Sequence, residues 1–239
     1  MDTKLYDKPL KIELKGEELF INEQKHPKSQ RVVKEIVNTL MEKADEGLDQ
    51  TLYYMYRDVY KKLDIRYDIT LIRAATIGKE CAKTHGHYHP KSEDGLAYPE
   101  LYQILSGKCT FILQKKNKNG SVSVMIVKAN KGETVLFPPD YGHVSINTGN
   151  DELIMCNLVY DSFEARYEDH KKNRGAAYYY LSGGQLVQNS NYVIEKSEQL
   201  TAKELNNRYN YECKDLLTEF FNNPKKFEFL AKPSLFFKK

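Results

Sequence analysis

KTHGHYHPKSEDGLAYPELYQILSG, residues 83–107, contains three histidines at alternate positions, then a polar loop, then an apolar segment that begins at Glu100. Residues two apart on a β-strand share a face, so a His-x-His pair places two imidazoles side by side. Two imidazoles can ligate a divalent metal together with a carboxylate that returns on a neighbouring strand. The stretch therefore predicts a metal site within a β-rich domain.

A second segment further along the chain, GETVLFPPDYGHVSIN (residues 132–147), offers one more histidine. A metal site needs ligands that are distant in sequence and convergent in space, with one position left open for a substrate. Taken together, the two segments indicate a small metal-binding β-barrel. The candidate ligands are His87, His89, Glu100 and His143.

Two of these ligands have rivals in the same stretch. His85 and His87 also alternate, but the proline that directly follows His89 would begin the polar loop and favours the later pair. Glu93 is a rival carboxylate close behind the histidines. Glu100 is favoured because it opens an unbroken apolar strand that ends at a glycine.

Composition excludes several classes of protein. The 239 residues are 41% hydrophobic and 29% charged, as is usual for a soluble globular protein, and the net charge of +3 is too small to indicate nucleic-acid binding. The apolar runs are too short to span a membrane, and the first residues, MDTKLYDKPLK, lack a signal-peptide core. The four cysteines have no CxxC spacing, so we expect reduced thiols in a cytoplasmic protein.

The chain divides into three expected parts. Residues 1–50 are predicted to form an arm and a helix over 29–44 that pack on the barrel, since Ser29 is a suitable N-cap. Residues 51–190 read as short strands separated by turns, and form the barrel with the metal site. Residues 191–239 are predicted to be a helical extension, because Thr201 and Glu204 make a capping box. Its aromatic tail would pack on another surface, for which a partner subunit is one candidate.

The motifs resemble those of a known family. Residues 100–107 and 132–147 are similar to the two sequence motifs of the cupin barrel, with a longer loop before Glu100 and with Asp140 where the second motif usually has glycine. The fuller patterns THGHYH (84–89), PELYQILSGK (99–108) and GETVLFPPDYGHVSINTGNDE (132–152) together resemble the cupin-type, metal-dependent glucose-6-phosphate isomerases. The likeness covers roughly residues 52–189. It implies a mainly β cupin barrel (double-stranded β-helix or jelly roll) with an N-terminal helix and a C-terminal helical extension.

The resemblance also implies roles for individual residues. Metal ligation falls to the candidate ligands His87, His89, Glu100 and His143, and substrate contacts fall to Thr70, Thr84, Gly86 and Tyr102. Tyr160 matches a tyrosine at the end of the strand after the second motif. The family then has a short segment with glycine and histidine, where this chain has DSFEARYEDHKK (161–172). His170 and Arg166 are the candidates for that role.

An isomerase of this kind would interconvert glucose 6-phosphate and fructose 6-phosphate, using one divalent ion of Fe, Mn, Ni or Zn. Glu100 is the candidate for moving a proton between the sugar carbons, while a direct hydride shift would need no base. Lys79, Lys83 and His85 could attract the phosphate group. The family analogy adds a homodimer, and the expected partners exclude nucleic acid and membrane. The alternatives are another metal cupin enzyme, such as a dioxygenase, and a non-catalytic sugar-phosphate-binding cupin.

Overall fold

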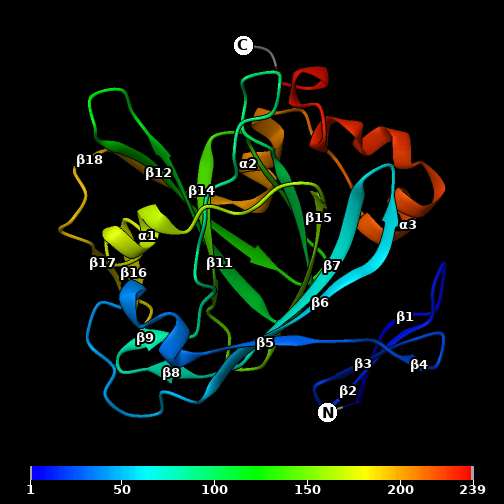
Figure 1. Cartoon of the computed structure of the whole chain (residues 1–239), viewed down its shortest axis with the longest axis horizontal. Coiled ribbons are helices and arrows are strands. Elements are labelled where there is room, and N and C mark those ends of the chain that lie inside the picture. Colours follow the sequence, from blue (N-terminus) through cyan, green and yellow to red (C-terminus); the bar gives the residue numbers. More distant parts are fainter. Residues whose placement is uncertain (1, 238–239) are drawn as a thin grey trace.

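Two facing β-sheets form the body of the molecule in a computed structural model that describes residues 2–237 (Figure 1). The first sheet has the spatial order β13-β10-β15-β7-β6-β5, and all its neighbours are antiparallel. Its strands are β5 (Ser29–Val32), β6 (Thr51–Lys62), β7 (Ile65–Ile72), β10 (Glu100–Ser106), β13 (Thr134–Phe137) and β15 (Leu153–Tyr160). This agrees with the mainly β architecture expected from the sequence.

The second sheet has the order β14-β11-β12-β18. Its strands are β11 (Lys108–Lys116), β12 (Val122–Asn130), β14 (Tyr141–Asn147) and β18 (Ile194–Thr201). Strand β18 pairs with β12 in parallel, so the sheet includes residues beyond 190 that were assigned to the extension. The division of the chain at residues 50 and 190 otherwise stays a prediction.

The side chains on the two faces of β6 and β7 lie in two different apolar cores. Tyr67, Ile69 and Leu71 lie in an outer core, which the six-stranded sheet shares with the N-terminal and C-terminal segments. Tyr53 and Ile72 lie in an inner core between the two sheets. The period of two that defines a strand therefore gives β6 and β7 two buried faces.

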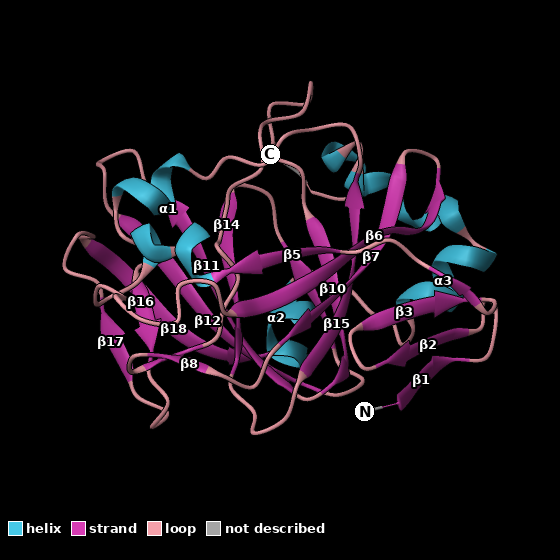
Figure 2. Cartoon of the chain, turned by 60° about the horizontal axis from the view of Figure 1, so that its bottom comes forward, coloured by secondary structure: helices cyan, strands magenta, loops and turns pink. Residues whose placement is uncertain are grey.

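The N-terminal residues form a sheet of their own, which is more structure than the expected arm. Its four antiparallel strands are β1 (Asp2–Tyr6), β2 (Ile12–Lys15), β3 (Glu18–Ile21) and β4 (Gln24–Lys25). This sheet lies beside the C-terminal helix α3 (Leu216–Asn222) in both cartoon views (Figure 2). The apolar residues of β2 and β3 join the outer core.

The predicted helix over residues 29–44 is wrong. Its first four residues form β5, which pairs with β6, and two short 3₁₀ turns follow at Val33–Glu35 and Val37–Thr39. Val33 and Ile36 are buried as the periodicity required, but a spacing of three serves a 3₁₀ turn as well as an α-helix. Consecutive β-branched residues lose side-chain freedom in a helix, so pairing at the sheet edge prevails.

The C-terminal region contains the expected capping box and two helices. Helix α2 (Ala202–Arg208) begins where the Thr201 N–H donates to Glu204 at 2.7 Å and the Glu204 N–H donates to the Thr201 hydroxyl at 3.2 Å. The buried apolar residues of this region lie on α2 and on the separate helix α3. The tail continues as 3₁₀ helices at Pro224–Leu230 and Pro233–Leu235, and buries Phe227 in the chain's own outer core. A partner subunit is therefore not required to cover it.

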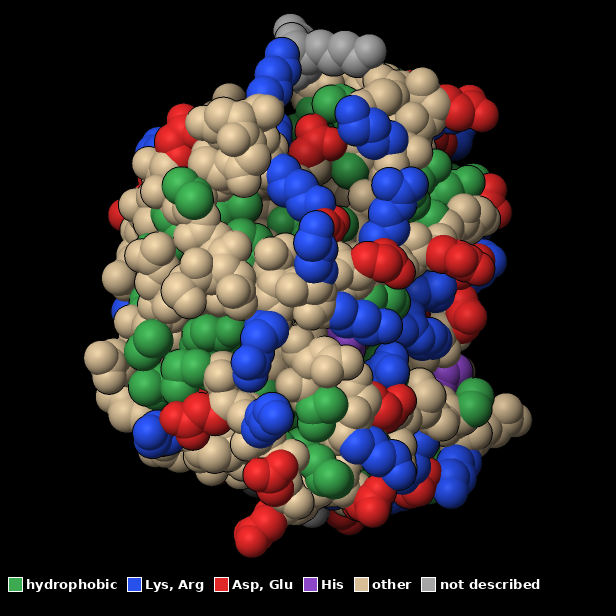
Figure 3. Space-filling model, turned by 60° about the vertical axis from the view of Figure 1, so that its left-hand side comes forward, with side chains coloured by type: hydrophobic (Ala, Val, Ile, Leu, Met, Phe, Trp, Pro, Cys, Tyr) green, Lys and Arg blue, Asp and Glu red, His purple; other side chains and the backbone are tan. Residues whose placement is uncertain are grey.

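Short elements complete the described chain. They are β8 (Thr76–Ile77), β9 (Glu80–Cys81), α1 (Glu168–Lys172), β16 (Tyr178–Tyr180) and β17 (Leu186–Gln188). The four cysteines are free thiols, as expected. Within residues 2–237, no helix has the length and apolar character needed to cross a bilayer. Figure 3 shows one face on which basic and acidic side chains are interspersed, in keeping with the small net charge.

Candidate metal centre

A cavity of about 330 Å³ lies on the inner face of the six-stranded sheet. Strands β6, β7, β10 and β15 line it, together with the segment 84–89, residue His143 and the loop 163–167. The inward-facing side chains of the strands follow the period of two, as with Asp68 and Thr70 on β7. The cavity lining contains the four candidate metal ligands and the five residues predicted to contact substrate.

The segment before β10 brings two histidines against a third. His87 forms a bridge with His143 of β14: the His87 N–H donates to the His143 carbonyl at 3.2 Å, and the His143 N–H donates back at 3.0 Å. The Thr84 N–H donates to the Ser145 carbonyl at 2.9 Å and fixes the same register. Because side chains two apart share a face, His89 then lies on the same side as His87.

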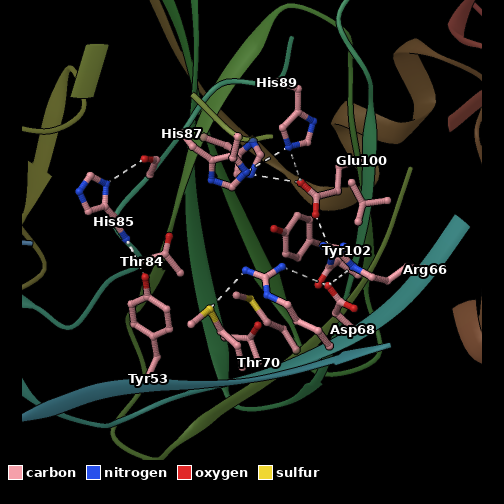
Figure 4. Close-up of a pocket in the computed structure, with 18 of the residues that line it drawn as sticks. Tyr53, Arg66, Asp68, Thr70, Thr84, His85, His87, His89, Glu100 and Tyr102 are labelled. Carbon is pink, nitrogen blue, oxygen red and sulfur yellow. Dashed lines mark hydrogen bonds and ion pairs between the residues drawn. The ribbon is translucent and has the colours of Figure 1, made fainter. Parts of the chain in front are cut away.

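Glu100, the first residue of β10, closes the group from the opposite sheet. Its Oε2 lies 3.4 Å from His89 Nε2 and 3.2 Å from His143 Nε2, and the Nε2 atoms of His87 and His89 are 3.1 Å apart. All four ligand atoms lie within 4.8 Å of one another. Figure 4 shows His87, His89 and Glu100 pointing toward one another, with His85 apart from them.

The three distances of 3.4, 3.2 and 3.1 Å fit a shared metal ion. Ligands held about 2.1 Å from an ion lie about 3.0 to 3.4 Å apart at neighbouring octahedral or tetrahedral positions. Glu100 Oε2 and His143 Nε2 are also buried without a hydrogen-bond partner among the described residues. Buried polar atoms of this kind call for an explanation, and a bound cation supplies one. The group could therefore hold a divalent metal through three nitrogens and one oxygen.

Neighbouring groups orient the ligands. The Asn157 amide of β15 donates to Glu100 Oε1 at 2.8 Å and leaves Oε2 to face the histidines. His89 Nδ1 lies 2.8 Å from the Tyr98 carbonyl, which directs its Nε2 toward the group. Such partners set the orientation and basicity of metal ligands. Asn157 was missed by sequence reasoning, because an asparagine on a strand gives no signal of this role.

The electrostatics keep the ligands in their metal-binding forms. Burial, reinforced by the neighbouring His143, holds the pKa of His87 well below its usual range. Burial lowers the pKa of His89 to about 4, although the nearby Glu100 opposes this shift. Burial alone would raise the pKa of Glu100, but the adjacent His143 and His89 leave it lowered. Two neutral imidazoles therefore face an ionised carboxylate at neutral pH.

The predicted substrate-contact residues all line the cavity. Thr70 is 8% exposed on β7, and the Thr84 hydroxyl accepts a hydrogen bond from the Ser145 N–H at 3.0 Å. Gly86 has a φ of +78°, and a Cβ there would lie 2.4 Å from a methyl group of Val144. The absence of a side chain at Gly86 therefore allows close packing against Val144, and the predicted contact of Gly86 with substrate is a separate role.

The two predicted tyrosines lie in aromatic clusters around the same cavity. Tyr102 stacks on Phe137 with ring centroids 4.6 Å apart and is 7% exposed. Tyr160 packs against Tyr98 at 4.7 Å, and Phe163 covers the ring of His89 at 4.5 Å. Aromatic packing therefore holds the cavity wall on both sides of the histidines.

The two rival residues lie outside the group of four ligands, although His85 lines the same cavity. Glu93 is exposed and outside the cavity lining, while the Nδ1 atom of His85 contacts the Gly86 carbonyl at 3.1 Å, away from the four ligands. Lys83 is buried, pairs with Glu80 and donates to the Thr39 carbonyl at 2.8 Å, so the suggestion that it attracts phosphate is wrong.

The candidates for the family's later segment also lie outside the cavity lining. His170 is fully buried behind Gly86, and Arg166 bonds to Tyr88 through its backbone. Neither residue is among those that face the cavity. The loop instead contributes Phe163, Ala165 and Tyr167.

A family model and several curated proteins that this chain resembles carry the same name, glucose-6-phosphate isomerase. A sequence model described as Glucose-6-phosphate isomerase (GPI) matches residues 15–195. Glucose-6-phosphate isomerase of Thermococcus onnurineus is 29% identical over 112 residues, which cover 46% of this chain and 55% of that protein. That of Thermococcus gammatolerans is 26% identical over 141 residues, covering 55% and 70%. The chain thus spans about half the length of several curated relatives it matches.

Solved structures give a weaker likeness. Oxalate decarboxylase of Lactobacillus farciminis superposes with a TM-score of 0.35 and 18% identity, over 48% of this chain and 30% of that one. A superposition this loose supports no argument about the fold or the site.

Proposed function

The chain belongs to the glucose-6-phosphate isomerase family, and we propose that it interconverts glucose 6-phosphate and fructose 6-phosphate with the help of one divalent metal ion. The observation that carries this proposal is the convergence of three imidazoles and one carboxylate within 4.8 Å in a cavity of small-molecule size. A place in glycolysis and gluconeogenesis and a cytoplasmic location accompany the proposal. A homodimer stays a prediction.

The metal would be held by His87, His89, Glu100 and His143. Nitrogen and oxygen donors in this ratio suit Fe²⁺, Mn²⁺, Ni²⁺ or Zn²⁺, and the donor set alone does not choose among them. When bound, such an ion supplies Lewis-acid stabilisation of negative charge on sugar oxygens. Its four protein ligands leave coordination positions free for those oxygens if the ion is five- or six-coordinate.

Glu100 is proposed to move the proton between C1 and C2 of the opened sugar. Its pKa is lowered by His143 and His89 despite burial, so the carboxylate is ionised and can accept a proton at neutral pH. The Asn157 amide holds Oε1 and turns Oε2 toward His89 and His143, so the same carboxylate would act both as a metal ligand and as the base. A direct hydride shift would need no base, and exchange of solvent deuterium into the product separates the two routes.

The remaining cavity residues are proposed to bind and orient the sugar. They are Thr70, Thr84, Gly86, Tyr102 and Tyr160. Thr84 accepts a hydrogen bond from a backbone N–H, which leaves its own O–H free to donate to a ligand. The aromatic rings on either side of the histidines narrow the cavity and exclude water around the reacting carbons.

A coupled assay tests this proposal. Fructose 6-phosphate is supplied, and the glucose 6-phosphate formed is followed before chelation, after chelation and after return of each candidate metal. We expect activity to disappear on chelation and to return with at least one metal. Activity that survives chelation would contradict the metal-dependent mechanism. Oxygen uptake without isomerisation would favour a dioxygenase, and saturable ligand binding without turnover would favour a sensor.

A further inference from the structure

The cavity is rich in arginine, which no sequence motif indicated. Arg31, Arg57 and Arg66 line it, facing two carboxylates, Asp68 and Glu100. Arginine stays charged at every pH a protein experiences, so each guanidinium in the cavity needs an anion or water nearby. The three arginines differ in how closely carboxylates of the described chain neutralise them.

Arg66 is fully paired. Its Nε lies 2.8 Å from Asp68 and its Nη1 lies 2.7 Å from Asp161, and its side chain is only 17% exposed. Two close carboxylates neutralise this guanidinium, and Figure 4 shows Arg66 and Asp68 side by side. Arg66 therefore has a structural role between β7 and the end of β15.

Arg57 is held much more loosely. Its Nη1 lies 3.6 Å from Asp68, a carboxylate that Arg66 already engages at shorter distance, and its Nη2 lies 3.6 Å from the Met55 sulfur. The side chain is 48% exposed. A long shared contact of this kind is weak, so the guanidinium can turn toward a stronger anion.

Arg31 carries an unused donor. Its Nη1 bonds to Glu35 at 3.0 Å, but its Nε is buried without a hydrogen-bond partner in the described part of the chain. Strand β5 places it there: Arg31 pairs with Tyr53 of β6, whose side chain also lines the cavity. A buried N–H without an acceptor costs free energy unless a ligand accepts from it.

We propose that Arg31 and Arg57 bind the phosphate group of the substrate and make the cavity selective for phosphorylated sugars. This inference rests on the proposed function, and it adds residues that the resemblance did not imply. The planar guanidinium matches a phosphate in geometry and charge, and two of them balance a dianion.

The test uses two ligands that differ only in the phosphate: 6-phosphogluconate and gluconate. Calorimetry with the metal-free protein measures the dissociation constant of each for the wild type, Arg31→Gln, Arg57→Gln and the double variant. Each single change should weaken 6-phosphogluconate binding about tenfold or more, because a charge-assisted hydrogen bond is lost. Gluconate binding should change less than about twofold.

Arg73→Gln is the matched control. Arg73 is 37% exposed and bonds to Glu152 at 3.0 Å, but lies outside this cavity. Thermal unfolding of every variant checks that the fold is retained, by comparing its unfolding midpoint with that of the wild type. In the isomerase assay, Arg31→Gln and Arg57→Gln should raise KM for fructose 6-phosphate about tenfold or more while kcat changes much less.

Several outcomes would overturn the inference. They are equal behaviour of the cavity variants and Arg73→Gln, an effect confined to one of the two arginines, an equal loss of gluconate binding, and a wild type with no preference for the phosphorylated acid. Failure of the isomerase proposal would give a different set of results from failure of the arginine inference. Phosphate selectivity that depends on both arginines, in a protein without isomerase activity, would support the arginine pair and contradict the isomerase proposal.

Discussion

Glu100 has two oxygens in different surroundings, and this difference organises the centre at the scale of single residues. Oε1 accepts the Asn157 amide at 2.8 Å, whereas Oε2 faces His89 and His143 at 3.4 and 3.2 Å. A carboxylate fixed through one oxygen presents the other in a single orientation. The proposed metal binding and the proposed catalysis both depend on that orientation.

Asn157→Leu should therefore weaken the centre without touching a ligand. The change removes the amide that holds Glu100 Oε1, and we expect metal affinity to fall roughly 10- to 100-fold. Titration of the metal-free protein against a chelator of known affinity measures this loss. Unchanged affinity in a folded variant would show that Asn157 does not position the carboxylate.

His170 makes stability depend on pH. Burial, helped by the nearby His143 and His85, lowers the pKa of His170 to about 3, whereas in the unfolded chain it titrates near about 6.5. Unfolding therefore takes up a proton between these values, and stability falls as the pH falls from about 6.5 toward 3. The slope from one such histidine is about 1.4 kcal/mol per pH unit.

His170→Leu should remove that part of the slope. Neither ring nitrogen of His170 has a partner within residues 2–237, so an apolar residue of similar size should preserve or raise stability at pH 7. Urea unfolding at pH 7, 6 and 5 gives the comparison. If the free energy of unfolding falls with pH at the same slope in wild type and variant, His170 does not contribute to the pH dependence.

At the scale of elements, the segment 84–89 packs closely against β14, and Gly86 within the segment makes that close packing possible. Gly86 has a φ of +78°, and a Cβ would lie 2.4 Å from Val144 and 2.9 Å from His170. The segment can approach β14 closely only because this side chain is absent. That approach aligns His87 with His143.

Gly86→Ala should destabilise the protein more than Gly120→Ala does. Gly120 has a similar φ of +85° but has no atom within 4 Å of its Cβ position, so it reports backbone strain alone, about 1–2 kcal/mol. Gly86→Ala adds a steric clash of about 1–3 kcal/mol. Denaturant unfolding of both variants measures the difference, and equal values would show that packing at Gly86 is not tight.

The strands and the ligand group could be predicted from the sequence because both leave periodic signals. Short apolar runs between turn signals predicted strands within residues 51–190, and the His-x-His pair with Glu100 and His143 identified the ligand atoms that lie within 4.8 Å. The helix over 29–44 was wrong because its spacing also suits a strand followed by 3₁₀ turns. Arg31 and Arg57 were missed because an arginine on a strand reads as solvated until the cavity is known.

At the scale of the whole molecule, the two ends of the chain cover one face of the six-stranded sheet. The N-terminal sheet, helix α3 and the 3₁₀ helix at Pro224–Leu230 share an outer core with β6, β7 and β15 (Figure 1). The cavity lies on the opposite face of the same strands. The ends therefore stabilise the sheet that carries the site without entering the site.

Phe227→Ala tests this arrangement. Phe227 is fully buried in the outer core, and its loss should cost about 3–5 kcal/mol. Phe221→Ala is the matched control, because Phe221 is 38% exposed and should cost much less. The destabilisation by Phe227→Ala should be the same in dilute and in concentrated protein, since Phe227 packs on its own chain. A destabilisation that changes strongly with protein concentration would place Phe227 at a subunit interface instead.

The metal content of purified protein tests the central claim most directly. Wild-type protein is stripped with a chelator, supplied with one candidate metal, desalted and analysed for metal per chain. We predict one ion per chain for the wild type and for His26→Ala, a histidine outside the cavity lining, and a large loss for His143→Ala and for Glu100→Ala. Folded His143→Ala and Glu100→Ala proteins that retain one ion per chain would contradict the shared metal centre.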